Sequence, residues 1–144
     1  MIGLLQRVTS ASVEVDGGII GQIDQGLMVL VGVEAEDAAS NAERLAERLC
    51  AYRVFEDETG RMNKSVGEIG GALLLVPQFT LAADTKRGNR PSFSRGAPPD
   101  VATQLFDHCA DEAATRIRVE RGRFGANMQV SLINDGPVTF WLTA

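Results

Sequence analysis

Two short polar segments carry the groups most able to do chemistry. Gln78 and Thr80 directly follow an apolar run that ends at Pro77. Such a run is typical of a buried strand, which would deliver both polar groups at its end. Thr80 could serve as a nucleophile only if a base activated its hydroxyl, and the sequence shows none nearby. The alternative is structural, because the same residues also end strands and bond to nearby backbone.

The second segment, Asn134–Thr139, holds the dipeptide Gly136-Pro137 between two alternating stretches. An X–Pro bond can be cis, and glycine relieves the clash that proline imposes on the residue before it. A cis bond would point two successive carbonyl oxygens in nearly the same direction, where they could accept hydrogen bonds from an ammonium group. The alternative is an ordinary hairpin turn, which favours the same residue types.

Conventional catalytic side chains are sparse. The single histidine, His108, falls in a predicted helix beside Cys109, which disfavours a Ser-His-Asp triad. Two separated cysteines and one histidine make a poor zinc site, and no phosphate-loop or dinucleotide-binding glycine pattern occurs. The 19 acidic residues allow many carboxylate pairs but select none. We therefore expect neither a metal nor a cofactor.

Composition fits one soluble domain over residues 1–144, with 44% hydrophobic and 23% charged residues. Cys50 and Cys109 are expected to be free thiols in a reducing compartment. The apolar runs are far shorter than the roughly 20 residues that span a membrane, and no secretory signal opens the chain. We expect a cytoplasmic protein without membrane contact.

The charge distribution is uneven. A net charge of -5 argues against a general nucleic-acid coat protein. Eight of the 14 basic residues nevertheless lie in two short clusters. The first comprises Lys86, Arg87, Arg90 and Arg95, and the second comprises Arg116, Arg118, Arg121 and Arg123. These clusters either form a phosphate-binding face on an acidic body or are solvated loops and strand faces.

Periodicity predicts the elements that position these segments. Residues 12–23 are expected to form a hairpin, 27–33 and 73–76 buried strands, and 85–99 a long loop. One helix is predicted to start at Ser40 with Glu43 in a capping box, or at Asp37. A second begins near Pro98-Pro99 with Val101, Leu105, Cys109 and Ala113 facing inward. Further strands are predicted at 53–55, 117–120, 128–132 and 138–142. This order indicates an α+β fold with a curved, mostly antiparallel sheet or barrel and two main helices.

A series of short motifs, in this order and spacing, resembles the D-aminoacyl-tRNA deacylase family, formerly described as D-tyrosyl-tRNA deacylases. The motifs are Gln6-Arg7-Val8, Phe55-Glu56-Asp57, Gly60-Arg61-Met62-Asn63, Gln78-Phe79-Thr80-Leu81-Ala82, Gly88-Asn89-Arg90-Pro91-Ser92-Phe93, Phe124-Gly125-Ala126-Asn127-Met128 and Asn134–Thr139. Together they cover nearly the whole chain. One departure is Pro77, where many members carry serine; proline offers neither a hydroxyl nor a backbone N–H.

The resemblance implies a homodimer with active sites at the subunit interface. At the active-site strand end, the resemblance implies Gln78, Phe79 and Thr80. It implies that Gly136 and Pro137 form a cis-proline motif, which reaches into the partner's site, and that Arg7 holds this motif. Phe124 and Met128 match positions around the terminal-adenosine pocket and the support of the motif. The partner implied is the aminoacylated 3′ end of tRNA.

The implied activity is hydrolysis of the ester that joins a D-amino acid to tRNA. The Gly136 and Pro137 carbonyls would bind the α-ammonium group, and N–H groups around Phe79 and Thr80 would face the ester carbonyl. A water would attack with help from the ribose 2′-hydroxyl. An L side chain would collide with the motif, whereas glycine has no side chain to reject, so glycyl-tRNA should also be cleaved. The alternatives are a non-catalytic dimeric tRNA-binding module and a general small-ester hydrolase.

Overall fold

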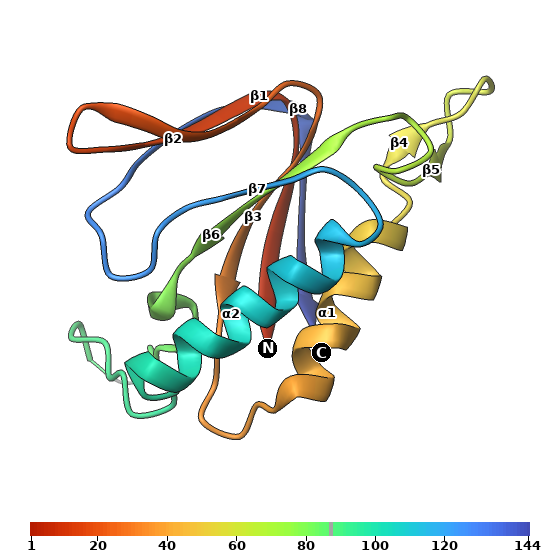
Figure 1. Ribbon diagram of the computed structural model, residues 1–144. Coiled ribbons are helices and arrows are strands. Elements are labelled where there is room, and N and C mark those ends of the chain that lie inside the picture. The colour runs from red at the N-terminus through yellow and green to blue at the C-terminus, as the bar shows by residue number, and fades with distance from the viewer. Residues whose placement is uncertain (87) are drawn as a thin grey trace.

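The computed structural model describes residues 1–86 and 88–144 (Figure 1). Its elements are β1 (Ile2–Val15), β2 (Gly18–Ile23), β3 (Gly26–Gly32), α1 (Ala39–Ala51), β4 (Phe55–Glu56), β5 (Met62–Lys64), β6 (Ala72–Pro77), the 3₁₀ turn η1 (Phe79–Ala82), α2 (Pro99–Ala114), β7 (Val119–Arg121) and β8 (Gln129–Thr143). Arg87, a member of the first basic cluster, lies outside the described residues.

The strands form one mixed sheet and one small hairpin. In the sheet the order is β2-β1-β3-β6-β7, with β8 paired to β1 off this path. Strand β1 runs antiparallel to β2, β3 and β8, whereas β3–β6 and β6–β7 are parallel. The parallel pairs arise because α1 and α2 lie in the connections, and parallel neighbours need such crossovers. The predicted α+β fold with a curved sheet and two main helices is confirmed.

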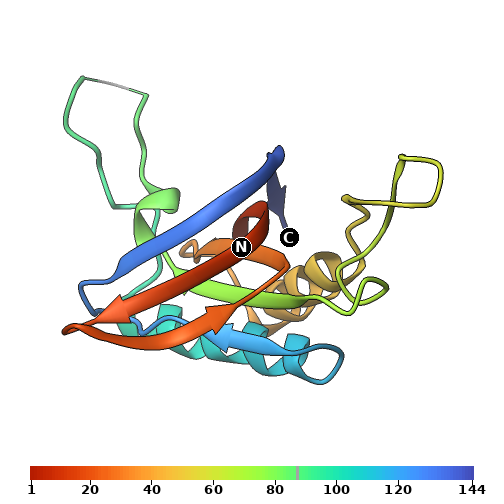
Figure 2. The ribbon, with the colours of Figure 1, turned by 90° about the horizontal axis from the view of Figure 1, so that it is seen from above.

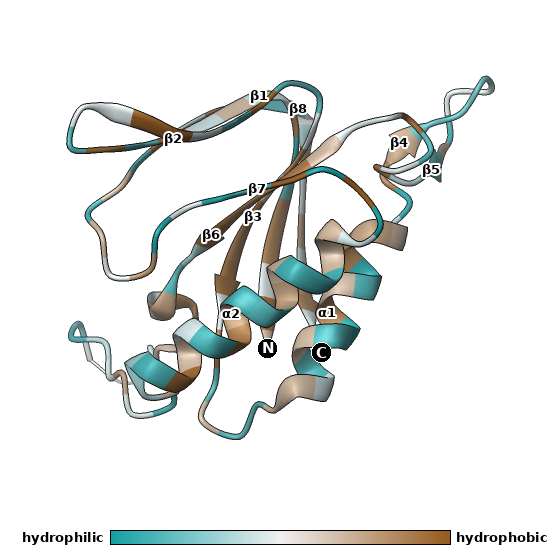
Figure 3. Ribbon diagram, viewed as in Figure 1, coloured by the Kyte–Doolittle hydropathy of each residue, from teal (hydrophilic) through white to brown (hydrophobic). Residues whose placement is uncertain are grey.

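Strand β6 shows why the sheet curls into a nearly closed barrel backed by helices. Leu73 and Leu75 pack into the core cluster that also contains the buried faces of α1 and α2. Leu74 and Val76 point the other way, into a second cluster with Val13 of β1. Both faces of β6 are therefore buried, which explains its unbroken apolar sequence. Figure 2 shows the helices below the sheet, and Figure 3 shows hydrophobic residues along its central strands.

Both helices differ in detail from the sequence prediction. Helix α1 begins at Ala39, and the Asn41 side-chain oxygen accepts the Ala38 N–H at 2.9 Å, so Ser40 is not the cap. In α2 the predicted inward residues Cys109 and Ala113 are buried, whereas in the first half of the helix Ala102 and Phe106 are buried in place of Val101 and Leu105. The predicted face is therefore correct in the second half of the helix and one residue out of phase in the first. Within the described chain, no helix has the length and apolar character that a membrane crossing requires.

Turn chemistry in the β4–β5 hairpin accounts for two of the sequence motifs, Phe55-Glu56-Asp57 and Gly60-Arg61-Met62-Asn63. The Asp57 carboxylate accepts hydrogen bonds from the Thr59 hydroxyl and N–H, the Asn63 amide and the Arg61 N–H. The Thr59 hydroxyl and the Asn63 amide contribute most, and together these bonds hold the pKa of Asp57 well below its usual range. Of the strand predicted over residues 53–55, only Phe55 lies in β4, which extends to Glu56 and is followed directly by this turn.

Candidate functional site

The strand end at Gln78 presents main-chain donors. The Gln78 N–H donates to the Val31 carbonyl at 2.7 Å, which completes the β3–β6 ladder, and the chain then turns into η1. Within η1 the Leu81 N–H donates back to the Gln78 carbonyl at 3.2 Å. The first amides of a helical turn have no acceptor inside it, and among the described residues no group accepts a hydrogen bond from the N–H of Phe79 or Thr80, so both are available to a ligand. The Phe79 side chain is 57% exposed.

The Thr80 hydroxyl is not set up as a nucleophile. Its Oγ1 accepts a hydrogen bond from Gln78 Nε2 at 2.6 Å, and among the described residues no carboxylate or imidazole bonds to it. His108 lies on α2 and pairs with Glu43 of α1 at 3.1 Å. Burial raises the pKa of the Cys109 thiol to about 12, so this cysteine is not a thiolate. The site therefore offers main-chain groups in place of side-chain acid–base chemistry.

A cavity of about 300 Å³ lies beside the strand end. Gln78 and Phe79 form one wall, and Phe124 and Met128 from the β7–β8 connection form the other. The Met128 sulfur accepts the Arg123 N–H at 3.3 Å, which holds this connection in place. The cavity matches the lower end of the range for small-ligand sites.

The Gly136-Pro137 motif interrupts a single strand and does not form a hairpin turn. The strands predicted at 128–132 and 138–142 are both parts of β8, and both pair with β1. Gln6 pairs with Thr139 and Val8 with Asn134, so the residues 135–138 bulge opposite Arg7 alone. The Gly136–Pro137 peptide is cis, and both residues are exposed. The hairpin alternative is thus wrong, because both flanking segments share one partner strand.

Arg7 holds this bulge from behind. Its Nε donates to the Asp135 carbonyl at 3.1 Å and lies 3.4 Å from the Asp135 carboxylate, and its Nη1 donates to the Val54 carbonyl at 2.7 Å. Arg7 is the only charged or polar residue among those described that is classed as buried, with 8% of its surface exposed. Asn134 adds a second support, because its side-chain oxygen accepts the Val138 N–H at 2.9 Å.

Replacing Arg7 with alanine should lower the free energy of unfolding by about 2–3 kcal/mol, because two carbonyls lose a charged donor in a buried setting. Urea denaturation monitored by circular dichroism measures this change. Arg44→Ala is the matched control, since Arg44 is 61% exposed and pairs only with Glu47 on the same helix; it should change stability by less than about 0.5 kcal/mol. Equal effects of the two substitutions would show that Arg7 does not brace the bulge.

The bulge and the strand end are separated within one protomer. Arg7 pairs with Leu27, and Leu27 pairs with Leu73, so the bulge is level with the beginning of β6. Gln78 follows five residues after Leu73, which at about 3.3 Å per residue places it about 16 Å further along the strand direction. Three strand spacings of about 4.8 Å separate β8 from β6 across the sheet. Within this protomer, the motif and the strand end therefore lie at different places on the sheet.

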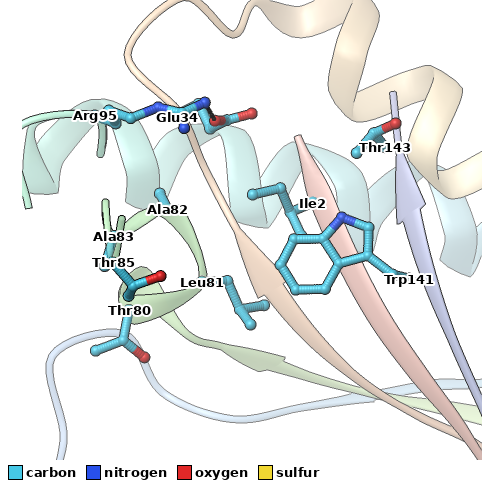
Figure 4. Close-up of a pocket in the computed structure, with 10 residues that line it drawn as sticks. All are labelled: Ile2, Glu34, Thr80, Leu81, Ala82, Ala83, Thr85, Arg95, Trp141 and Thr143. Atoms are coloured by element: carbon cyan, nitrogen blue, oxygen red, sulfur yellow. Dashed lines mark hydrogen bonds and ion pairs between the residues drawn. The ribbon is translucent and has the colours of Figure 1, made fainter. Parts of the chain in front are cut away.

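A wider groove of about 460 Å³ lies on the other side of Thr80 (Figure 4). Trp141 of β8 lies beside Ile2 of β1, and Leu81 of η1 faces them. The Trp141 side chain is 53% exposed. Sequence analysis did not single out Trp141, although its position two residues after Thr139 put it on the outward face of the strand.

Phe93 is a second residue that the sequence analysis left without a role. Its ring packs against Phe79, with the two centroids 5.1 Å apart, although both side chains remain about half exposed. An aromatic residue in a polar, proline-rich loop was the available signal. Phe93 therefore ties the loop of residues 84–96 to the strand end.

The fold and the site define a small barrel-like α+β protein in which the strand end at Gln78 and Phe79 borders a cavity that Phe124 and Met128 also line. The family described as D-Tyr-tRNA(Tyr) deacylase matches residues 4–143. The D-aminoacyl-tRNA deacylase of Vibrio cholerae is 59% identical over all 144 residues of both chains, and that of Aliivibrio salmonicida is 56% identical over 142 residues, 99% of each. The chain belongs to the D-Tyr-tRNA(Tyr) deacylase family.

Solved structures agree with this assignment. A protein titled c-Myc DNA Unwinding Element Binding Protein has a TM-score of 0.94 at 38% identity, covering 100% of this chain and 99% of the other. A probable eukaryotic D-amino acid tRNA deacylase has a TM-score of 0.87 at 16% identity, covering 99% and 98% of the two chains. The latter likeness concerns the fold alone.

Proposed function

We propose that this protein hydrolyses the ester bond of D-aminoacyl-tRNA in the cytoplasm, releases the free D-amino acid and tRNA, and thereby proofreads chirality in translation. One observation carries the proposal: the chain holds an exposed Gly136-Pro137 motif braced by Arg7 and free amides at Phe79 and Thr80. These are the two kinds of main-chain group that an aminoacyl ester needs, acceptors for its ammonium group and donors for its carbonyl oxygen.

The mechanism works by positioning. The Gly136 and Pro137 carbonyls accept hydrogen bonds from the α-ammonium group, and the Phe79 and Thr80 amides stabilise the oxyanion that forms when water attacks. The terminal adenosine occupies the cavity between Phe79 and Phe124. An aminoacyl ester is an activated substrate, so alignment of the neighbouring ribose 2′-hydroxyl with the attacking water supplies the proton transfer that the protein lacks.

The active unit is a homodimer in which each motif completes the partner's site. The separation of bulge and strand end within one chain supports this arrangement. The exposed Trp141 and the half-buried Leu81 line the groove beside Thr80 and offer an apolar surface for a second copy. A two-fold axis places the same surfaces on both subunits, so two identical sites form together.

Chirality is decided by rejection. Once the ammonium group and ester carbon are fixed, the side chain on Cα has one direction for each enantiomer. The D side chain points out of the site, and the L side chain collides with the Gly136-Pro137 backbone. Glycine has no side chain to collide, so glycyl-tRNA is a substrate too.

Deacylation of D-tyrosyl-tRNA and L-tyrosyl-tRNA at equal enzyme concentration tests the function. We expect kcat/KM for the D ester to exceed that for the L ester by at least roughly 100-fold, since such a clash costs about 3 kcal/mol. Equal cleavage of both esters would indicate a general ester hydrolase. Salt-sensitive tRNA binding without cleavage would indicate a non-catalytic binding module.

A further inference from the structure

The described residues 84–86 and 88–96 form a loop, hereafter the basic arm, which is attached firmly at its base. Asp84 and Ser92 exchange two backbone hydrogen bonds of 2.8 and 3.0 Å, which close the loop between them. Further along, the Arg95 carbonyl accepts the Ala35 N–H at 2.9 Å. Figure 2 shows the arm projecting from the body beyond η1. Groups on the arm therefore stand at a defined side of the molecule, outside the cavity.

The tip of the arm carries the positive charges of Lys86 and Arg90, and the one carboxylate of the arm, Asp84, lies at its base, where it accepts the Lys86 N–H at 3.0 Å. Lys86 and Arg90 are exposed, and residues 85–99 contain no acidic side chain. Among the described residues, no ion pair involves either of them, whereas Arg95 at the base pairs with Glu34 at 3.0 Å. Lys86 and Arg90 are thus available to bind an anion, whereas Arg95 is already paired with Glu34.

The second basic cluster is different. Arg118 pairs with Glu120 at 2.9 Å, and Arg121 pairs with Asp111 at 2.7 Å. These two arginines are partly neutralised within the protein, whereas Arg116 and Arg123 are exposed and form no ion pair among the described residues. The arm is the better candidate for binding an anionic partner because Phe93, on the same loop, contacts Phe79 at the strand end.

The arm adjoins the strand end. Phe93 contacts Phe79 with ring centroids 5.1 Å apart, and Phe79 also lines the cavity of about 300 Å³. If the terminal group of a polyanion occupies that cavity, the phosphates next to this group lie close to the arm. The chain as a whole has a net charge of -5 and repels such a polyanion, so local cations must offset this repulsion.

We propose that the basic arm binds the phosphates of the tRNA acceptor end through Lys86 and Arg90, next to the terminal adenosine. This inference rests on the proposed function, because the ester site fixes where the acceptor end lies. The arm then recognises the RNA backbone without regard to sequence, and it supplies affinity for tRNA while taking no part in the chemical step.

Arg90→Glu tests this proposal with two substrates, D-tyrosyl-tRNA and D-tyrosyl-adenosine, an ester that has no phosphates. We expect kcat/KM for the tRNA ester to fall about tenfold, and its salt dependence to become shallower by about one unit of log–log slope. Cleavage of the adenosine ester should stay unchanged, which also shows that the variant is folded. Arg44→Glu, on the outer face of α1, makes the same charge change and should affect neither substrate.

Two results would overturn the proposal. An unchanged tRNA reaction in Arg90→Glu would show that the arm does not touch the substrate, and an equal loss on both esters would show that it acts on the cavity itself. Failure of the proposed function looks different, because the wild-type protein would then cleave neither ester. In that case, the affinity of Arg90→Glu for uncharged tRNA still tests the arm, and equal affinity to wild type would refute it.

Discussion

Gly136→Ala is expected to lower kcat/KM for D-aminoacyl-tRNA by roughly 10³-fold in a protein that still folds. Gly136 has a φ of +132°, and an added Cβ would lie 2.7 Å from Val138 Cγ2 and 3.1 Å from Arg7 Nη2. The motif must therefore move. A shift of about 1 Å in a substrate-positioning group can cost about 100-fold, and weakening a hydrogen bond to an ammonium group adds about tenfold. Single-turnover deacylation measures the loss.

Gly17→Ala provides the matched control for this substitution. Gly17 also has a positive φ, +79°, but nothing lies within 4 Å of an added Cβ. We expect this variant to lose about 1 kcal/mol of stability and to keep full activity. Wild-type activity in Gly136→Ala would remove the motif from the mechanism.

Mixing protomers can show whether the motif acts across the interface. Phe79→Pro removes one proposed oxyanion donor at the first position of η1, where proline is tolerated. A heterodimer of Phe79→Pro and Gly136→Ala protomers should regain activity, because one of its two sites combines an intact strand end with an intact partner motif. Absence of recovery in a verified heterodimer would contradict the interface arrangement.

A tRNA whose terminal ribose lacks the 2′-hydroxyl should be cleaved at least about 100-fold more slowly than the natural substrate, because the assisting group is gone. Thr80→Ala should keep activity within about threefold, because the proposal uses the Thr80 amide and not its side chain. The Thr80 hydroxyl accepts from Gln78, and no base among the described residues contacts it. Parallel rate measurements on the two esters and the two proteins separate these contributions.

The opposite pattern would support covalent catalysis. Complete loss of activity in Thr80→Ala with its fold intact, together with normal cleavage of the 2′-deoxy substrate, would make the threonine a nucleophile. Gln78→Ala is a useful companion, since it removes the donor at 2.6 Å from the hydroxyl while leaving the η1 amides in place. It should behave like Thr80→Ala if both side chains serve only the local geometry.

The elements were predictable where local patterning dominates. The β1–β2 hairpin, the apolar strands β3 and β6, and both helices follow from periodicity and turn residues. The inward face of α2 was predicted correctly at Cys109 and Ala113 but not in the first half of the helix, because Val101 and Ala102 are both apolar and leave the phase of the pattern open there. Tertiary packing therefore decided what the helical period left open.

The geometry of the candidate site could not be predicted from the sequence, because it depends on pairing between strands that are far apart in the chain. Asn134–Thr139 has the composition of a turn, and only its common partner β1 makes it a bulge. Pro77 is a similar case, because proline is unusual inside a sheet. It is tolerated at the last position of β6, beyond the final β6–β7 pair, Leu75 with Arg121. Contacts of Phe93 and Trp141 likewise depend on neighbours far away in sequence.

Strand β8 stops pairing with β1 after Asn134 and pairs with it again from Thr139. Because both halves of β8 pair with the same strand, the register of one half fixes that of the other. Side chains alternate along a strand, so deleting one residue between Asn134 and Thr139 would turn Trp141 inward and Leu142 outward. The number of residues between Asn134 and Thr139 is therefore constrained as strictly as their identity. Substitutions in the flanking parts of β8 should be tolerated more easily than an insertion or deletion in this segment.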